Sequence, residues 1–276
     1  MDATHLIVLS RSDPVARAVL EEWGSVPATG DSVDGAPLRQ WAGGPFILVR
    51  DRLHIHDDWV ERRLPAVVAD QINAVVYASI HRSESGTRCF TVHPLGNFGS
   101  SAEVGGAAHF LVPAAPRLMT DALRRLDEGG EDAGIPATFE ATHHGPLSHV
   151  PSFFAEIGFG ADPSPPVAAT RVLARVLPEI RPDPQDRVVV GVGGGHYAPH
   201  FTDLALHRHW AFGHIISRHA LLGVDGATAQ LAMEATPGAE GALYARRADL
   251  GLPSTAGLQP RLSEGLAGRR DRPGTV

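Results

Sequence analysis

An apolar strand that runs directly into glycines is the feature that most limits how this chain can fold. Arg187–Val192 is a β-branched apolar segment of the length expected for a buried strand. Glycines end and follow this strand, at Gly191, Gly193, Gly194 and Gly195. The chain must therefore turn tightly there, or let another group approach its backbone. The GVGGGH spacing lacks the G-x-G-x-x-G pattern of dinucleotide-binding folds.

The residues after this turn carry side chains suited to chemistry. His196, Tyr197 and His200 come directly after the glycines. Ligands of open α/β sheets bind just beyond the carboxyl ends of the strands, so this turn is where a site is expected. A glycine-rich connection with incidental histidines is an equally good interpretation of this stretch taken alone.

Apolar strands alternate with amphipathic helices along most of the chain. Strands are predicted at residues 5–10, 46–49, 53–55, 74–80, 90–93, 137–142, 153–157, 187–192 and 211–217. Helices are predicted at residues 14–23, 115–126, 167–177 and 228–235, and a loop at 26–44. This alternation predicts an α/β fold with a mixed, mostly parallel sheet and helices on both faces. We expect one domain over residues 1–276, with a loosely ordered tail from about residue 252.

The composition excludes several classes of enzyme. All 24 basic residues of the 276 are arginine, so Schiff-base enzymes, PLP enzymes and Walker-A nucleotide hydrolases, which need a lysine, are excluded. Cys89 is the single cysteine, which rules out an internal disulfide and a cysteine-rich zinc site. A metal site would have to use histidine and carboxylate, and the chain has 15 histidines.

Charge and hydropathy indicate an ordinary globular protein. The net charge of -7 does not favour a general binder of nucleic acids, and DNA is not an expected partner. Paired arginines could still build one positive face, although each pair alone is more often solvated surface: Arg62–Arg63, Arg124–Arg125, Arg246–Arg247 and Arg269–Arg270. No apolar run is long enough to span a membrane, and the N-terminus lacks signal-peptide features, so we expect a cytoplasmic protein.

Histidine follows the end of an apolar strand, together with glycine or proline, at four places. The histidines concerned are His93, His143, His144, His196, His200 and His214. Parallel strands that end at the same sheet edge would bring these imidazoles together, and imidazole binds zinc at neutral pH. The adjacent pair His143–His144 cannot both face one side of a strand, so at least one is expected to be structural. Glu140 and Glu156 could each act as ligand, partner of a ligand, or general base.

These segments resemble the archaeal and plant type of D-aminoacyl-tRNA deacylase. The likeness is carried by HPLGNFG (93–99), EATHHGP (140–146), EIG (156–158), GVGGGHYAPHFT (191–202) and GHI (213–215). The resemblance implies a zinc-dependent hydrolase that cleaves the ester between a D-amino acid and the terminal ribose of tRNA. It also implies an α/β core similar to those of peptidyl-tRNA hydrolases and nucleoside phosphorylases.

The resemblance also suggests roles for individual residues. The metal-ligand candidates are His93, His143, His144 and His196, and the catalytic candidates are Glu140, Glu156, His196 and Tyr197. Substrate-binding candidates are Asn97, Gly193, Gly194, Gly195, His200 and Thr202. Zinc could supply a nucleophilic water by lowering its pKa to about 7, and could polarise the ester carbonyl.

Several alternatives remain open at this point. Zinc could be structural, with a ribose hydroxyl of the substrate activating the water. The chain could also be a zinc amidohydrolase or nucleoside-processing enzyme that acts on a small molecule. A non-enzymatic RNA-binding protein with structural zinc is a third class. We expect a monomer or a weak homodimer.

Overall fold

The computed structural model describes residues 4–82, 86–160, 164–223 and 226–251, with residues 255 and 258. The predicted tail from residue 252 otherwise lies outside the described residues. No described helix is both long enough and apolar enough to cross a membrane.

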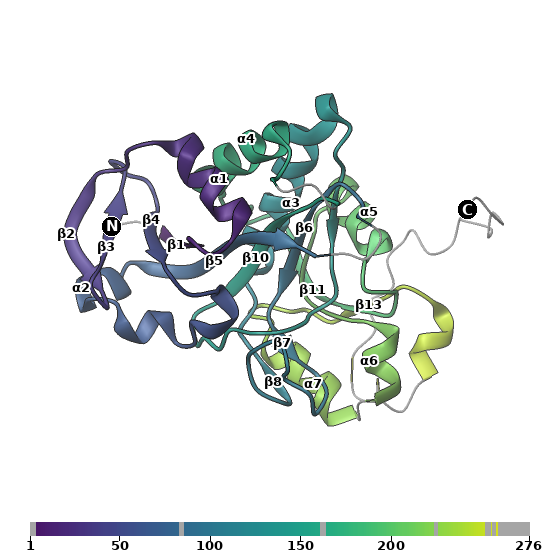
Figure 1. The fold of residues 1–276 in the computed structure, drawn as a ribbon. Coiled ribbons are helices and arrows are strands. Elements are labelled where there is room, and N and C mark those ends of the chain that lie inside the picture. The colour runs from purple at the N-terminus through teal and green to yellow at the C-terminus, as the bar shows by residue number, and fades with distance from the viewer. Residues whose placement is uncertain are drawn as a thin grey trace.

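The core of the fold is an eight-stranded mixed sheet (Figure 1). Its strand order is β2-β3-β4-β1-β5-β10-β6-β9. The strands are β1 (Thr4–Ser10), β2 (Ala28–Val33), β3 (Ala36–Gln40), β4 (Phe46–Arg50), β5 (Ile72–His81), β6 (Cys89–Pro94), β9 (Ala137–Phe139) and β10 (Ser152–Gly158). The four central strands β4, β1, β5 and β10 are parallel, whereas β6 and β9 run antiparallel to β10. The predicted mixed, mostly parallel sheet is confirmed.

A second, three-stranded parallel sheet adjoins the first. It consists of β11 (Arg187–Val192), β12 (Trp210–Ile216) and β13 (Ala242–Tyr244), and a two-stranded ribbon is formed by β7 (Gly96–Asn97) and β8 (Phe110–Leu111). The strand predicted over residues 137–142 ends at Phe139. The next residues join the two sheets instead, because Ala141 N–H donates to His196 O at 2.8 Å and Thr142 N–H to Ile215 O at 2.9 Å.

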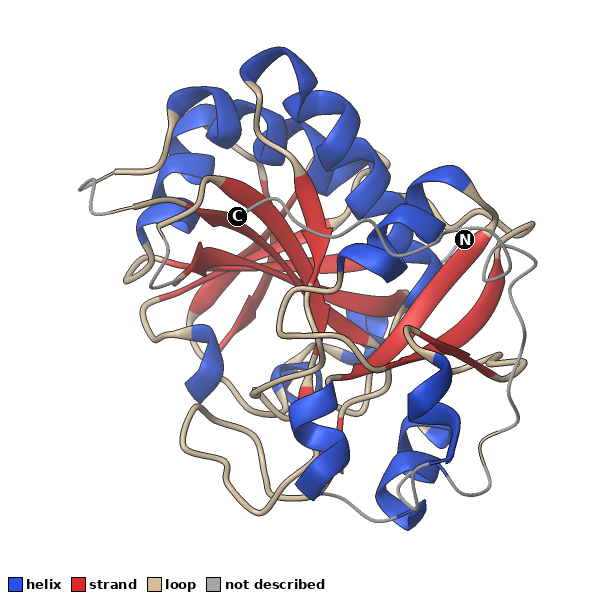
Figure 2. Ribbon diagram, turned by 90° about the vertical axis from the view of Figure 1, so that its right-hand side faces the viewer, coloured by secondary structure: helices blue, strands red, loops and turns tan. Residues whose placement is uncertain are grey.

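Three helices cover one face of the large sheet: α1 (Pro14–Trp23), α3 (Pro116–Gly130) and α4 (Val167–Val176) (Figures 1 and 2). Asp13 begins α1, since its Oδ1 accepts hydrogen bonds from Val15 N–H and Ala16 N–H. On this face β10 contributes Phe153, Ala155 and Ile157 to the larger apolar core. The alternate side chains of β10 therefore point to the opposite face, and they include Glu156.

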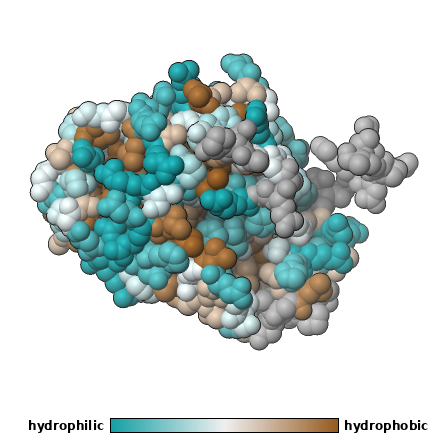
Figure 3. Space-filling view, in the orientation of Figure 1, coloured by the Kyte–Doolittle hydropathy of each residue, from teal (hydrophilic) through white to brown (hydrophobic). Residues whose placement is uncertain are grey.

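The opposite face of the large sheet is covered by short helical turns, α2 (Ala66–Ala69), η1 (His54–His56) and η2 (Val60–Arg63). The remaining helices follow the second sheet or end other elements: α5 (Pro199–His207), α6 (Arg218–Gly223), α7 (Gly226–Glu234), η3 (Glu131–Ala133), η4 (Leu177–Glu179) and η5 (Arg247–Gly251). Hydrophobic residues on the face seen in Figure 3 form small separate groups among hydrophilic ones.

Two local predictions were wrong. The loop predicted over residues 26–44 contains the edge strand β2 and its neighbour β3, joined by a turn at Asp34 and Gly35 with φ of 49° and 80°. β2 is largely exposed and β3 is mostly half-buried, and neither has the apolar alternation by which a strand is recognised. The strand predicted over residues 53–55 is η1, where the buried His54 hydrogen-bonds through Nε2 to Ala78 O at 2.8 Å.

Candidate functional site

A cavity of about 500 Å³ lies beside the junction of the two sheets. Four of the predicted site residues line it: Asn97, His143, Gly195 and His196. Phe98, Ser217 and His219 are also in its wall. The volume falls within the usual range for a small-molecule site, about 300–1,000 Å³.

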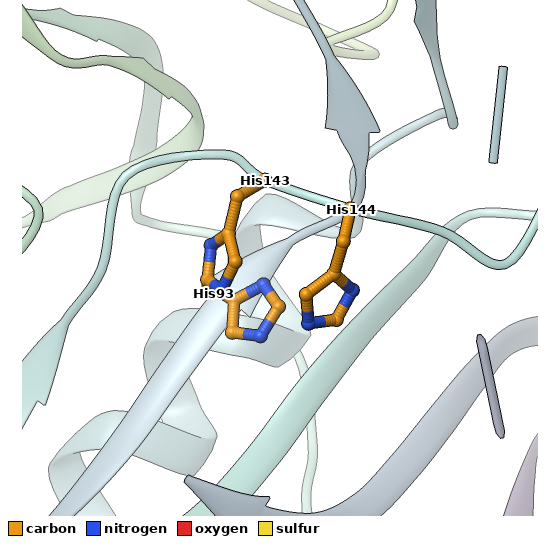
Figure 4. A group of neighbouring side chains, drawn as sticks. All are labelled: His93, His143 and His144. Carbon is orange, nitrogen blue, oxygen red and sulfur yellow. The ribbon is translucent and has the colours of Figure 1, made fainter. Parts of the chain in front are cut away.

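Three histidines form a compact cluster behind this cavity (Figure 4). His93 comes from β6, and His143 and His144 come from the segment after β9. One ring nitrogen of each lies within 4.8 Å of one from each of the others. The ring centroids of His93 and His143 are 3.9 Å apart, and the His93 ring stacks on Phe154 with centroids 5.1 Å apart.

All three rings use Nδ1 in the same way. Nδ1 of His93 lies 3.2 Å from Pro94 O, that of His143 2.8 Å from Ala141 O, and that of His144 2.6 Å from Gly145 O. A proton on Nδ1 donated to each carbonyl leaves Nε2 as the acceptor atom. This is the arrangement that histidine ligands of metals adopt, with the second nitrogen oriented by a backbone carbonyl.

The backbone explains how two consecutive histidines share one cluster. His143 and His144 lie beyond the end of β9, and His144 has a left-handed φ of 40°. The strand geometry that would turn the two side chains to opposite sides therefore does not apply to this pair, and both rings join the cluster. Gly145 must be glycine, because a Cβ there would lie 2.2 Å from Gly106 N.

Hydrogen bonds from the segment that includes η2 hold the loop that follows the histidine pair. Asp58 Oδ1 accepts a hydrogen bond from Leu147 N–H at 2.7 Å, and Trp59 N–H donates to Leu147 O at 2.7 Å. Glu61 Oε1 accepts from His149 N–H at 2.9 Å. The histidine pair is thus positioned by residues more than 80 places earlier in the chain.

Two buried glutamates form the second half of the site. Glu156 pairs in the sheet with Ser79 on one side and Thr91 on the other, and both hydroxyls donate to its carboxylate. Glu140 is fully buried, and its Oε1 lies 3.0 Å from His81 Nδ1 and 3.3 Å from His196 Nε2.

His81, at the end of β5, joins these groups. Its Nδ1 lies between the two carboxylates, 3.0 Å from Glu140 and 3.6 Å from Glu156, and its Nε2 lies 2.8 Å from Tyr197 Oη. Since the ring can donate at both nitrogens, His81 connects Tyr197 to the buried carboxylates. His196 differs from the other histidines of the site in being half-exposed, with 52% of its side chain accessible.

The pKa shifts follow from these contacts. Burial opposes the charged form of His81, but the carboxylates of Glu140 and Glu156 outweigh burial and raise its pKa to about 11. Burial likewise opposes the charged form of Glu140, yet His196 and His81 lower its pKa to about 2. Burial and the neighbouring His93 lower the pKa of His144 to about 4. At neutral pH the site therefore combines ionised carboxylates, a protonated His81 and a neutral His144.

The three-histidine cluster fits a metal ion. Three imidazoles are a common ligand set for zinc, and His143 of this set also lines the cavity. Among the described residues, His93 Nε2 and both carboxylate oxygens of Glu140 are buried without a hydrogen bond of good geometry. Buried polar atoms are rarely left without a partner, so these atoms call for a further ligand such as a cation or water. A second group, His81, Glu140 and His196, has similar spacing.

Comparison with known proteins identifies the family. The family model described as D-aminoacyl-tRNA deacylase matches residues 68–250, which include all the predicted site residues. The chain belongs to the D-aminoacyl-tRNA deacylase family. The deacylase of Thermoplasma acidophilum is 32% identical over 90% of this chain and 92% of that protein, and that of Thermoplasma volcanium 28% identical over 88% and 90%. The crystal structure of AF0625, a conserved protein of unknown function, matches with a TM-score of 0.77 at 27% identity, over 88% of this chain and 86% of that chain.

Some residues that the family resemblance suggested lie outside the cavity wall. Gly193 has φ of 99°, and a Cβ there would meet Asp249 Oδ2 at 2.5 Å, so this glycine serves close packing. Thr202, on α5, donates to Ala198 O and accepts from Phe139 N–H, which fixes the helix against β9. Gly194 and His200 do not line the cavity either.

His214 does not join the cluster. It is fully buried in β12, where Nδ1 contacts Thr142 Oγ1 at 3.1 Å and Nε2 contacts Val112 O at 3.0 Å. Conversely, His81 was not among the residues predicted from the sequence. The signal was present, since His81 follows the apolar residues 74–80, but no glycine or proline comes directly after it.

We expect His81→Gln to destabilise this deacylase in a pH-dependent way. Glu140 and Glu156 would remain buried without their shared cation, which typically costs about 3–5 kcal/mol. The contribution of His81 is fully present below its ordinary pKa of 6.5 and is lost as pH rises toward 11. That of Glu140 is present above 4.5 and is lost as pH falls toward 2. The free energies of unfolding of wild type and His81→Gln should therefore differ most between pH 4.5 and pH 6.5.

Urea unfolding at about pH 5.5 and about pH 9 measures this difference. The gap in free energy of unfolding between wild type and His81→Gln should be larger at the lower pH. His56→Gln, at an exposed histidine, is the matched control. A gap of the same size at both pH values would show that His81 does not hold a shared proton between the carboxylates.

Proposed function

We propose that the histidine-lined cavity hydrolyses the ester between a D-amino acid and the terminal ribose of tRNA. Membership of the family supports this hydrolase activity and a tRNA substrate. The observation that carries the assignment to this cavity is the pairing of His143 and His196 in its wall, with ring centroids 4.8 Å apart. His143 belongs to the three-histidine cluster, and His196 contacts the buried Glu140.

In this proposal His196 carries out both proton transfers, and Glu140 assists it. Water attacks the ester carbonyl carbon, and the proton that it loses is accepted by His196 Nδ1, the ring nitrogen that does not face Glu140. The same imidazole then donates this proton to the leaving oxygen of the ribose, so that the products are a free amino acid and a ribose hydroxyl. Glu140, ionised at neutral pH, lies 3.3 Å from the other ring nitrogen, Nε2, where it orients His196 and stabilises its imidazolium.

Zinc is the cofactor we assign to His93, His143 and His144. When bound, the ion lowers the pKa of a coordinated water to about 7 and polarises the ester carbonyl. His143 and His196 both line the cavity, so a substrate carbonyl bound there would lie near the proposed zinc ligands and near the group proposed to transfer protons. Glu156 Oε2 lies 3.7 Å from His93 Nε2, so this carboxylate faces the nitrogen that would bind the ion and would balance part of its positive charge.

Asn97 is the residue we assign to the amino acid end of the substrate. Its Nδ2 is used by the fold, donating to Gly105 O at 3.0 Å and Ala107 O at 3.3 Å. Its Oδ1 can then accept a hydrogen bond from the α-ammonium group. Gly195, in the same wall, has no side chain to obstruct the terminal adenosine.

We place this reaction in the cytoplasm, where aminoacyl-tRNA is used, and propose a monomer or weak homodimer.

Removal of the metal is expected to abolish deacylation. Dialysis against a chelator should leave less than about 1% of the activity, because both the nucleophilic water and the carbonyl polarisation are lost. Added zinc should restore turnover, and elemental analysis should show the metal bound before treatment. Full turnover by protein shown to be metal-free would disprove the zinc assignment. Zinc binding without turnover on any aminoacyl-tRNA would instead indicate a structural metal in an RNA-binding protein.

A further inference from the structure

A second cavity, which we call the arginine cavity, lies at the carboxyl ends of β1 and β4. Its volume is about 540 Å³, and it shares no lining residue with the histidine-lined cavity. Six charged residues line it: Arg11, Arg39, Arg50, Arg52, Asp34 and Asp51. All of them precede the part of the chain that the family model matches, residues 68–250.

The arginine cavity is positive in a chain whose net charge is -7. Its wall holds four guanidinium groups and two carboxylates, so positive charges exceed negative ones by two. Both carboxylates are already paired, Asp51 with Arg11 at 3.2 Å and Asp34 with Arg50 at 2.6 Å. The excess positive charge must therefore be met by solvent or by an anion.

Arg39 and Arg52 carry most of this excess. Arg39 donates to a backbone carbonyl oxygen at 2.8 Å and has no acidic partner within the described part of the chain. The carboxylate near Arg52 is that of Asp57, at 3.9 Å. Asp57 is fully buried and already pairs with Arg50 at 2.9 Å and with Arg63. A bound anion would supply the missing charge to both Arg39 and Arg52.

We propose that the arginine cavity binds phosphate groups, and that these belong to the backbone of the tRNA substrate; this rests on the proposed deacylase function. Guanidinium is a planar fork of donors that matches phosphate oxygens, and it stays charged at any relevant pH. Arg50 has only 3% of its side chain exposed and is held by Asp34 and Asp57. The wall is thus fixed before the ligand arrives, which limits the entropy lost on binding.

The position of the arginine cavity favours a substrate shared with the catalytic groups. β1 pairs with β5 in parallel, with Leu9 opposite Ala78, so Arg11 follows β1 beside the end of β5 where His81 lies. β4 is two strands from β5. At about 4.8 Å between strands, the arginine cavity begins about 10 Å from that edge of the catalytic site. A stacked strand spans this distance in about three nucleotides.

A basic path leads from the arginine cavity over η2 toward the loop that begins with the histidine pair. Arg63 contacts Asp34 at the arginine cavity, and the neighbouring Arg62 lies over the ring of Trp59, 4.2 Å from its centroid. Trp59 N–H donates to the loop that begins with the histidine pair, and His149 of this loop lies 2.6 Å from Arg62. Arg62 and His149 are exposed. A phosphate backbone can therefore run from the arginine cavity to the catalytic loop along exposed basic groups.

The double variant Arg39→Gln/Arg52→Gln tests this proposal. Its matched control is Arg246→Gln/Arg247→Gln, which removes two exposed arginines and changes the net charge equally. Binding of deacylated tRNA should weaken by about 10-fold or more in the cavity variant only. The slope of log affinity against log salt should fall by about 1.5 for two lost phosphate contacts. Hydrolysis of D-tyrosyl-adenosine, an ester with no phosphate, should stay within about twofold of wild type and so reports an intact fold and active site.

Three results would overturn the proposal. Unchanged tRNA binding in the cavity variant, with wild-type turnover of D-tyrosyl-tRNA intact, would reject the arginine cavity while leaving the deacylase function standing. Equal weakening in both variants would show that overall charge, rather than this cavity, attracts tRNA. Calorimetric binding of inorganic phosphate that the cavity variant loses, with tRNA binding unchanged, would assign the cavity to a free phosphate compound. Absence of turnover in the wild type would instead reject the proposed function.

Discussion

Replacing His143 or His196 with alanine is expected to reduce turnover of D-tyrosyl-tRNA by at least about 100-fold. The two changes remove different contributions. Under the proposed mechanism, His143→Ala takes one imidazole from the three-histidine cluster and should reduce the affinity for zinc, whereas His196→Ala should remove the group that transfers protons. Both side chains line the cavity, so the effect should appear in kcat more than in substrate binding.

The controls separate this effect from a general loss of structure. His56 is exposed, and His207 has 69% of its side chain accessible, so alanine at either should change turnover by less than about twofold. His54 lies outside the motifs but is a poor control, because it is buried against Tyr77 and Phe154. Measuring the zinc content of each variant distinguishes the two roles, since His143→Ala should lose zinc and His196→Ala should retain it. Small, equal effects in all four alanine variants would show that the histidine cluster is structural.

The second large expected effect is the preference for the D form of the substrate. L-aminoacyl-tRNA is the substrate of translation, so a useful deacylase must leave it intact. The two substrates have the same bonds and differ only in the arrangement around one carbon atom. A pocket that fixes the ester and the terminal adenosine can reject the L form by leaving its ammonium group without a partner. A loss of about 3–4 kcal/mol corresponds to a preference of several hundredfold.

Asn97 is the residue expected to carry part of this preference. If its Oδ1 accepts the ammonium group of the D form, Asn97→Ala should reduce kcat/KM for D-tyrosyl-tRNA far more than for L-tyrosyl-tRNA. The measurement is single-turnover hydrolysis of both substrates at the same enzyme concentration. Cleavage of the L form within about tenfold of the D form in the wild type, which is only about 1.4 kcal/mol, would contradict chiral proofreading even for an active zinc esterase.

Much of this fold and site could be predicted because the signals are local. Arg187–Val192 forms a buried strand through its β-branched apolar residues, and the glycines after it allow the turn that delivers His196. The strand-then-histidine pattern correctly brought His93, His143 and His196 to one place, since β6 and β9 are parallel neighbours. The outer strands β2 and β3 were missed, because their sequences, ATGDSV and APLRQ, carry no apolar periodicity.

Only the tertiary structure decided which groups touch. Glu156 meets His93 and His81 because β10 lies between β5 and β6, and strand order is not written in the periodicity of any one strand. The pair Arg124–Arg125, a candidate positive face in the sequence, is bound to carboxylates, with Arg124 held by Asp186 at 2.7 and 2.9 Å.

The arginine cavity could not be predicted from the sequence either. Its arginines are scattered between Arg11 and Arg52 and form no run in the sequence. Residue type and strand periodicity thus determined which side chains could act and at which strand ends they stand. Parallel and antiparallel pairing, together with the left-handed turn at His144, decided their distances, because contacts between strands far apart in the chain depend on how the sheet assembles.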